Sequence, residues 1–99
     1  MTFRPVRLIL VPLLALMLAG PAQAECYVDY KAKQDDPLRL AYGVSQVSDA
    51  ACDKPKQAKA ELGPRLAADG WTLLKILSSF GAEGLGERKA SAGEFFLRY

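Results

Sequence analysis

The feature that most constrains the fold is the leader at the start of the chain. It runs from a basic start at Arg4 and Arg7, through an apolar stretch at 8–18, to the triplet Ala22-Gln23-Ala24. This order is typical of a secretory signal peptide with an A-x-A cleavage site. Residues 1–24 are therefore predicted to be removed by cleavage between Ala24 and Glu25. Residues 25–99 would then form one small exported domain.

A membrane anchor is the alternative reading of the leader. The apolar stretch has 11 residues and contains Pro12, whereas about 18 or more apolar residues are needed to span a bilayer. Lipidation of Cys26 is not expected either, because the charged Glu25 stands where a lipoprotein signal requires a small residue. We therefore expect no stable membrane insertion after cleavage, and a location in the periplasm or outside the cell.

The chain has two cysteines, Cys26 and Cys52, and both follow the leader. An even number of cysteines in an exported protein indicates a disulfide. A Cys26–Cys52 bridge is worth about 3.5 kcal/mol in the chain-entropy model, which is a large contribution for so small a core. A reactive thiol is not expected, since the chain has no C-x-x-C motif and no histidine.

Alternating apolar and polar residues predict two strands, over 26–33 and 38–45, with the turn Asp35-Asp36-Pro37 between them. A helix is expected from Asp53, as its N-cap, to Asp69-Gly70, where Gly70 would provide a left-handed cap. Its apolar stripe is narrow and consists of Ala58, Leu62 and Leu66. Gly63-Pro64 predicts a kink or a break within it.

Two further strands are expected near the end of the chain. The segment 71–80 is apolar on both faces, which predicts a central strand, and 94–99 alternates, which predicts a closing strand. The Gly-rich segment 81–93 between them is interpreted as a mobile hairpin loop. The predicted fold is therefore α+β, a two-layer domain with a largely antiparallel four-stranded sheet in the order ββαββ and one helix on one face.

A single helix would leave the other face of the sheet open. An open apolar face predicts contact with a protein partner or with a second copy of the chain.

The sequence Gly70-Trp71-x-Leu73 and the closing Phe95-Phe96-Leu97-Arg98-Tyr99 resemble a family of short bacterial proteins of unknown function. Members of that family have a helix, a Gly-Trp-x-Leu strand, a loop and an aromatic closing strand. The resemblance covers residues 55–99, and this chain differs by its longer N-terminal hairpin, its cysteine pair and its leader. The resemblance implies a fold, but the family has no known activity that could be assigned to this chain.

The composition excludes several classes of function. Without histidine, the chain cannot form Ser-His-Asp or Cys-His catalytic sets or the common zinc sites. Two of its thirteen basic residues lie in the leader and all eleven acidic residues follow it, so the mature chain is neutral and no nucleic-acid binding is expected. No catalytic, cofactor or metal residues are predicted.

The Gly-rich segment contains the candidate contact residues, which are Gly84, Gly86, Arg88 and Lys89. Backbone amides and cations of this kind can hold a phosphate, but Glu83 and Glu87 would repel an anion. We therefore interpret the segment as a contact loop. Asp35-Asp36 is interpreted as a turn and not as a calcium site, and the aromatic residues are assigned to the core.

These observations predict a disulfide-stapled binding, accessory or inhibitor module of the periplasm that is not an enzyme. The alternative is a small hydrolase that uses carboxylates on envelope material, which would need two carboxylates in one concave pocket. A carrier of a small apolar ligand ranks last, because so small a domain rarely encloses a large cavity.

Overall fold

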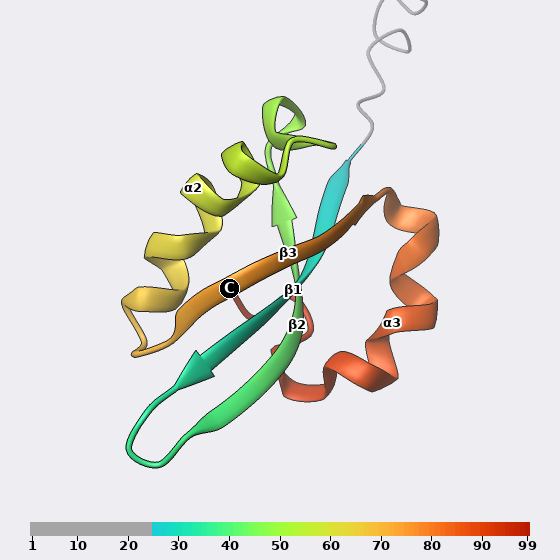
Figure 1. Ribbon diagram of the computed structural model, residues 1–99. Helices are drawn as coiled ribbons and strands as arrows, with labels where there is room; N and C mark the ends of the chain where they lie inside the picture. The colour runs from blue at the N-terminus through green and yellow to red at the C-terminus, as the bar shows by residue number, and fades with distance from the viewer. Residues whose placement is uncertain (1–24) are drawn as a thin grey trace, which may run out of the picture.

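The computed structural model describes residues 25–99, in which an antiparallel three-stranded sheet lies between two helices (Figure 1). The predicted signal peptide, with Ala24, lies outside the described residues. The strands, helices and 3₁₀ turns follow in the order β1 (Cys26–Gln34), β2 (Arg39–Val47), η1 (Asp49–Ala51), α2 (Pro55–Ala67), β3 (Thr72–Phe80), η2 (Ala82–Gly84), α3 (Leu85–Ala92) and η3 (Gly93–Phe95).

The sheet has the strand order β2-β1-β3, so β1 is its central strand. The predicted β1–β2 hairpin is confirmed, with Cys26 opposite Val47 and Gln34 opposite Arg39. The prediction that 71–80 forms the central strand is wrong, because β3 lies at an edge. Its pairing with β1 is interrupted twice, and the unpaired residues at the interruptions are Leu74 and Leu77, which are exposed. Leu74 and Leu77 are therefore not core residues, whereas Ile76 and Phe80 pack against the core from opposite faces of the sheet.

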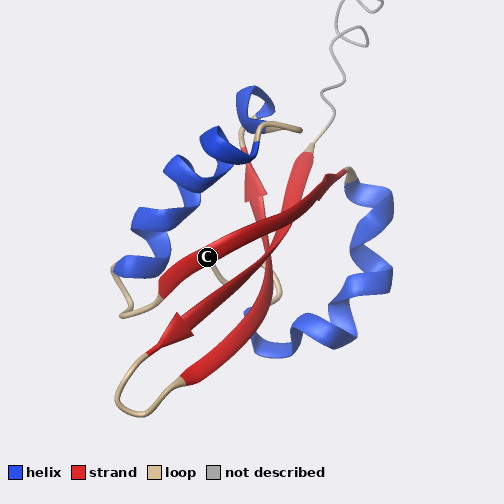
Figure 2. Cartoon of the chain, viewed as in Figure 1, coloured by secondary structure: helices blue, strands red, loops and turns tan. Residues whose placement is uncertain are grey.

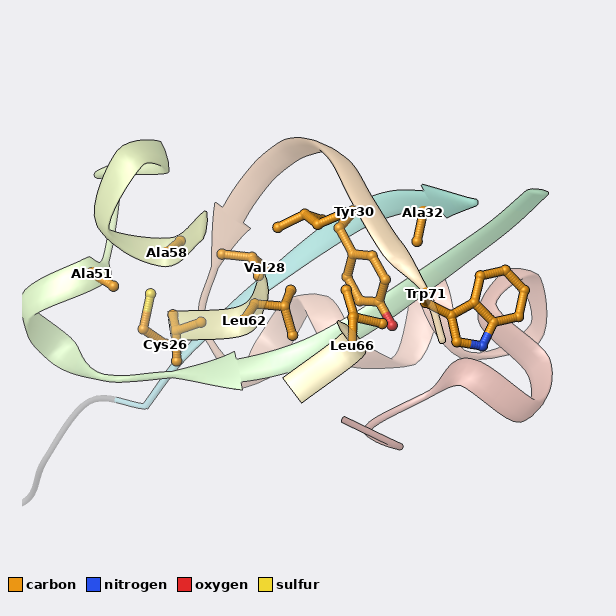
Figure 3. Close-up of a cluster of buried hydrophobic side chains, with 11 residues drawn as sticks. Cys26, Val28, Tyr30, Ala32, Ala51, Ala58, Leu62, Leu66 and Trp71 are labelled. Atoms are coloured by element: carbon orange, nitrogen blue, oxygen red, sulfur yellow. The ribbon is translucent and has the colours of Figure 1, made fainter. Parts of the chain in front are cut away.

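One face of β1 forms the main core with α2. Alternation places Val28 and Tyr30 on the same face of the strand, and Figure 3 shows them against Leu62 and Leu66 of α2. The helical stripe predicted from Ala58, Leu62 and Leu66 is confirmed, since all three are fully buried. The disulfide between Cys26 and Cys52, with a Cα–Cα distance of 5.7 Å, joins the start of β1 to the segment before α2.

The helix α2 is continuous through Pro64, so of the two outcomes predicted at Gly63-Pro64, a kink or a break, the break is absent. Gly63 provides a reason, because a residue before proline is pushed out of the helical conformation by a clash that involves its Cβ, and glycine has none. The predicted N-cap is also wrong: Lys54 occupies that position, and Asp53 has a left-handed φ of 58°. Gly70, with φ 83°, is in the predicted left-handed conformation.

The prediction of a four-stranded sheet with one helix is wrong, although the domain is α+β. The expected fourth strand begins as η3 and then makes one parallel bridge, between Phe96 and Val44. Leu97 donates from its backbone N–H to the Val44 carbonyl at 2.8 Å, but its own φ of 56° ends the extended backbone there. Arg65 holds the last residue, because its Nη1 donates to the Tyr99 carbonyl at 3.0 Å.

The predicted loop at 81–93 contains the second helix, α3. Between Gly86 and Gly93 the sequence ERKASA consists mainly of good helix formers, and Gly93 ends the helix with a φ of 56°. Ala92 of α3 packs with Tyr27 and Val44, which lie on the sheet face opposite α2. That face is therefore partly covered and not fully open as expected.

Candidate functional site

A polar hollow of about 210 Å³ lies at the end of the main core, where four segments of the chain meet. Its aromatic floor is formed by Trp71, which precedes β3, and Phe95 of η3, whose ring centroids are 5.1 Å apart in an edge-to-face arrangement. Trp71 is buried, as Figure 3 shows at one end of the core. The remaining lining residues are polar or charged, and they are Gln34, Arg39, Asp69, Glu94 and Arg98. We call this site the arginine hollow.

Arg39, the first residue of β2, forms one wall of the arginine hollow. Its guanidinium lies 5.6 Å from the centroid of the Trp71 ring, within the range of a cation–π contact. Its Nη1 donates to Oε1 of Gln34 at 3.2 Å. Arg39 makes no ion pair with any residue in 25–99. A guanidinium has five N–H donors, so several donors of an oriented cation remain for a ligand.

Arg98 also lines the arginine hollow and is neutralised by two carboxylates. Its Nη1 lies 3.1 Å from Glu94 and its Nη2 lies 3.8 Å from Asp69. Asp69 also accepts a hydrogen bond from the Tyr99 hydroxyl. Burial, followed by this hydrogen bond, raises the pKa of Tyr99 above its ordinary value. The two arginines therefore differ, since Arg98 is compensated and Arg39 is not.

A second polar cluster is centred on Asp29, under α3. This carboxylate is buried and accepts hydrogen bonds from the Ser78 hydroxyl at 2.7 Å and the Tyr42 hydroxyl at 2.8 Å. Arg88 of α3 also donates to it, from Nε at 3.2 Å. The cluster connects α3 to the sheet, because Asp29 is buried and Arg88 reaches it from the helix.

The pKa of Asp29 reflects two opposing influences. Burial by itself raises this pKa, but the hydrogen bonds from Ser78 and Tyr42 and the charge of Arg88 outweigh burial and hold the pKa below its ordinary value. Burial, followed by the hydrogen bond to Asp29, raises the pKa of Tyr42 to about 12. The carboxylate is thus ionised and the phenol neutral at every physiological pH.

The predicted contact residues are not assembled into an anion site. Arg88 is engaged with Asp29, with the Gly84 carbonyl at 2.8 Å and with Glu87 at 2.9 Å. Gly84 is needed for packing, because a Cβ there would lie 2.8 Å from both Arg88 and Phe80. Gly86 and Lys89 line a wide, open hollow of about 620 Å³ beside Phe96. Of the two predicted cations, Arg88 is paired with carboxylates, whereas Lys89 lies exposed on α3 and has no carboxylate partner in 25–99.

Two further predictions concern metal sites and membrane helices in residues 25–99. No group of three or more potential metal ligands occurs in this part of the chain. None of the helices formed there is long and apolar enough to cross a membrane. Asp35 and Asp36 lie in the turn between β1 and β2, as predicted, and Asp35 pairs with Lys33 at 3.2 Å.

Comparison of the chain with protein-family models, with curated proteins and with solved structures found no match. The resemblance to the family of short bacterial proteins stays a prediction.

Sequence reasoning did not find the arginine hollow. In the predicted strand 38–45, alternation places Arg39 only among the polar residues, and the aromatic residues are assigned to the core. The sequence signal is weak, since Arg39 is a single cation near the turn Asp35-Asp36-Pro37. The residues that face one another in the hollow are separated by up to about sixty positions, so only the fold brings them together.

Proposed function

We propose that the mature chain is an exported binding module of the periplasm, and that the arginine hollow is where it takes a small ligand with a carboxylate. The observation that carries the proposal is Arg39, a cation held over Trp71 with no carboxylate partner in 25–99. A planar guanidinium binds a carboxylate through two parallel hydrogen bonds. The disulfide is compatible with an oxidising compartment.

The hydrolase alternative has less support from the same site. Asp69 and Glu94 do line one hollow, which is the arrangement that the alternative requires. Both carboxylates, however, are paired with Arg98 and are largely exposed. A general acid needs a carboxyl that holds its proton near neutral pH, and a neighbouring cation favours the ionised form. We therefore propose binding and not hydrolysis.

The proposal can be tested with the fluorescence of Trp71, which is the single tryptophan of the chain. The oxidised protein is titrated with N-acetylmuramyl-dipeptide, which carries a sugar ring and one free carboxylate, and separately with uncharged N-acetylglucosamine. We expect the Trp71 fluorescence to change saturably with the dipeptide. This fluorescence change should be lost in Arg39→Gln, and the uncharged sugar should cause little change. Lys59→Gln on the exposed side of α2 is the control, since it removes the same charge away from the hollow.

The outcomes distinguish the candidates. Equal responses from Arg39→Gln and the parent protein, or no response to the dipeptide, would count against the binding proposal. Release of a hydrolysed product from the dipeptide, abolished by Asp69→Asn or Glu94→Gln, would instead support the hydrolase.

A further inference from the structure

Three lysines gather on the part of the sheet that α3 leaves uncovered. Lys31 and Lys33 share a face of β1 with Asp29, since side chains alternate along a strand. In the register of the sheet, Lys31 lies opposite Lys75 of β3, and Lys33 lies opposite Leu40 of β2. We call this surface the lysine face, and define it as Lys31, Lys33, Lys75, Leu40 and the adjoining Leu38.

The positive charge of the lysine face is only partly compensated. Lys33 pairs with the exposed Asp35, whereas Lys31 and Lys75 make no ion pair with any residue in 25–99. Lys31 and Lys75 are also direct cross-strand partners. Like charges at opposed positions destabilise a sheet. The stability of the sheet therefore does not explain why two lysines are paired here. An anion from outside the domain would reduce the repulsion between them.

Exposed leucines adjoin these lysines. Leu40 and Leu38 are the two most exposed large apolar residues of the described chain, at 71% and 64%. They lie at the turn of the β1–β2 hairpin, which extends beyond the ends of both helices in Figure 2. A partner that fits this surface must therefore offer negative charge and an apolar layer side by side.

We propose that the lysine face docks the domain onto an anionic lipid surface. Acidic headgroups would neutralise the lysines, and the leucines at the hairpin turn would enter the interfacial layer beside them. The domain would adsorb without inserting a helix. This inference does not rest on the proposed function, because the lysine face and the arginine hollow lie on opposite faces of the sheet.

The same charges disfavour the predicted homodimer through this face. A two-fold dimer places the same patch of both copies in contact. The lysine face would then meet another lysine face, and the repulsion already present between Lys31 and Lys75 would be multiplied. An anionic partner fits the surface, and a second copy does not.

The test is co-sedimentation of the exported protein with vesicles. One set contains equal parts of phosphatidylglycerol and phosphatidylcholine, and the other contains phosphatidylcholine only. We expect binding to the anionic set, a steep fall with added salt, and roughly 30-fold weaker binding for Lys31→Gln/Lys75→Gln, from about fivefold per lysine. Lys54→Gln/Lys56→Gln removes the same charge at the start of α2 and is expected to bind like the parent protein.

A second pair of variants tests the leucines. Leu40→Ser is expected to weaken binding, whereas Leu97→Ser, an exposed leucine outside the lysine face, is not. Loss of the lysine pair removes a repulsion, so Lys31→Gln/Lys75→Gln remains folded. Three outcomes would each overturn the proposal. The two double-lysine variants could lose binding equally, the parent protein could bind both vesicle sets equally, or it could bind soluble polyglutamate more tightly than anionic vesicles. The last result would point to an acidic polypeptide instead.

Discussion

The pairing of Tyr30 with Gly43 shows how one residue without a side chain shapes the core. The two are cross-strand partners on β1 and β2, and the Tyr30 ring is fully buried. A Cβ at position 43 would overlap the Tyr30 hydroxyl and would come within 2.5 Å of its Cζ. Gly43 is therefore required because a large aromatic ring crosses its backbone, and not because of an unusual φ angle.

Gly43→Ala should destabilise the domain by about 1–3 kcal/mol, the usual cost of overpacking a filled core. Gly86→Ala is the matched control, because it lies in α3 with open space at its Cβ and should stabilise the helix by roughly 0.5–1 kcal/mol. Urea unfolding of both variants measures the difference. A Gly43→Ala domain as stable as the parent would show that Tyr30 can move aside.

At the scale of elements, α3 is attached to the sheet by one buried carboxylate. Arg88 reaches from α3 to Asp29, and its guanidinium lies 3.8 Å from the centroid of the Phe80 ring. Ala92 is the only buried residue of α3. Because this apolar contribution is small, the charged contact between Asp29 and Arg88 is expected to carry much of the stability of α3 on the sheet.

Asp29→Asn should therefore reduce the free energy of unfolding by about 2 kcal/mol at neutral pH, as charged hydrogen bonds are lost. The folded-state pKa of Asp29 is lowered, so its contribution is present above the unfolded pKa of about 3.9 and is lost as the pH falls through the folded pKa. Urea unfolding of parent and variant should differ at pH 7 and converge at strongly acidic pH.

The control is Glu87→Gln, since Glu87 pairs with the same arginine but is 72% exposed. It should change stability by no more than about 0.5 kcal/mol. A constant difference between parent and Asp29→Asn across the whole pH range would contradict the assignment.

At the scale of the whole molecule, the disulfide joins the sheet to the segment before α2 at one end of the main core. Cys26 opens the central strand and Cys52 lies just before the helix that covers it. The bridge thus connects the beginning of the predicted mature chain to its longest helix. It adds a covalent restraint to a core built from few large side chains.

The intact mass of the exported protein should correspond to a chain that starts at Glu25, without an acyl group, and should increase by two hydrogens on reduction. Reduction should lower the free energy of unfolding by about 3.5 kcal/mol, from the chain-entropy cost of the released loop. An added acyl mass or a different first residue would contradict the predicted processing. A reduced protein as stable as the oxidised one would contradict the stabilising role of the bridge.

Local sequence patterns predicted correctly those elements in which the apolar residues of the pattern are also the buried residues of the structure. The β1–β2 hairpin, the stripe Ala58, Leu62 and Leu66, the cap at Gly70 and the disulfide all follow from residues close in sequence or from a count of two cysteines. Two errors are local, namely the N-cap at Asp53 and a break at Gly63-Pro64, whereas the errors that change the fold concern the segments from Trp71 onward. Apolar residues on both faces suggested a central strand, but β3 uses Leu74 and Leu77 at irregularities of an edge strand. Four glycines in 81–93 suggested a loop, although the residues between Gly86 and Gly93 favour a helix.

The sequence by itself determined the class of fold, the alternation that builds the main core and the cysteine pairing, because these depend on periodicity and residue type. Only the tertiary structure decided the strand order, the position of α3 and the two candidate surfaces. Arg39 meets Trp71, and Lys31 meets Lys75, through strand register and chain crossing, which bring together residues far apart in sequence. Residues 25–99, which are neutral in sum, can therefore present a basic face, since net charge does not specify where the charges meet.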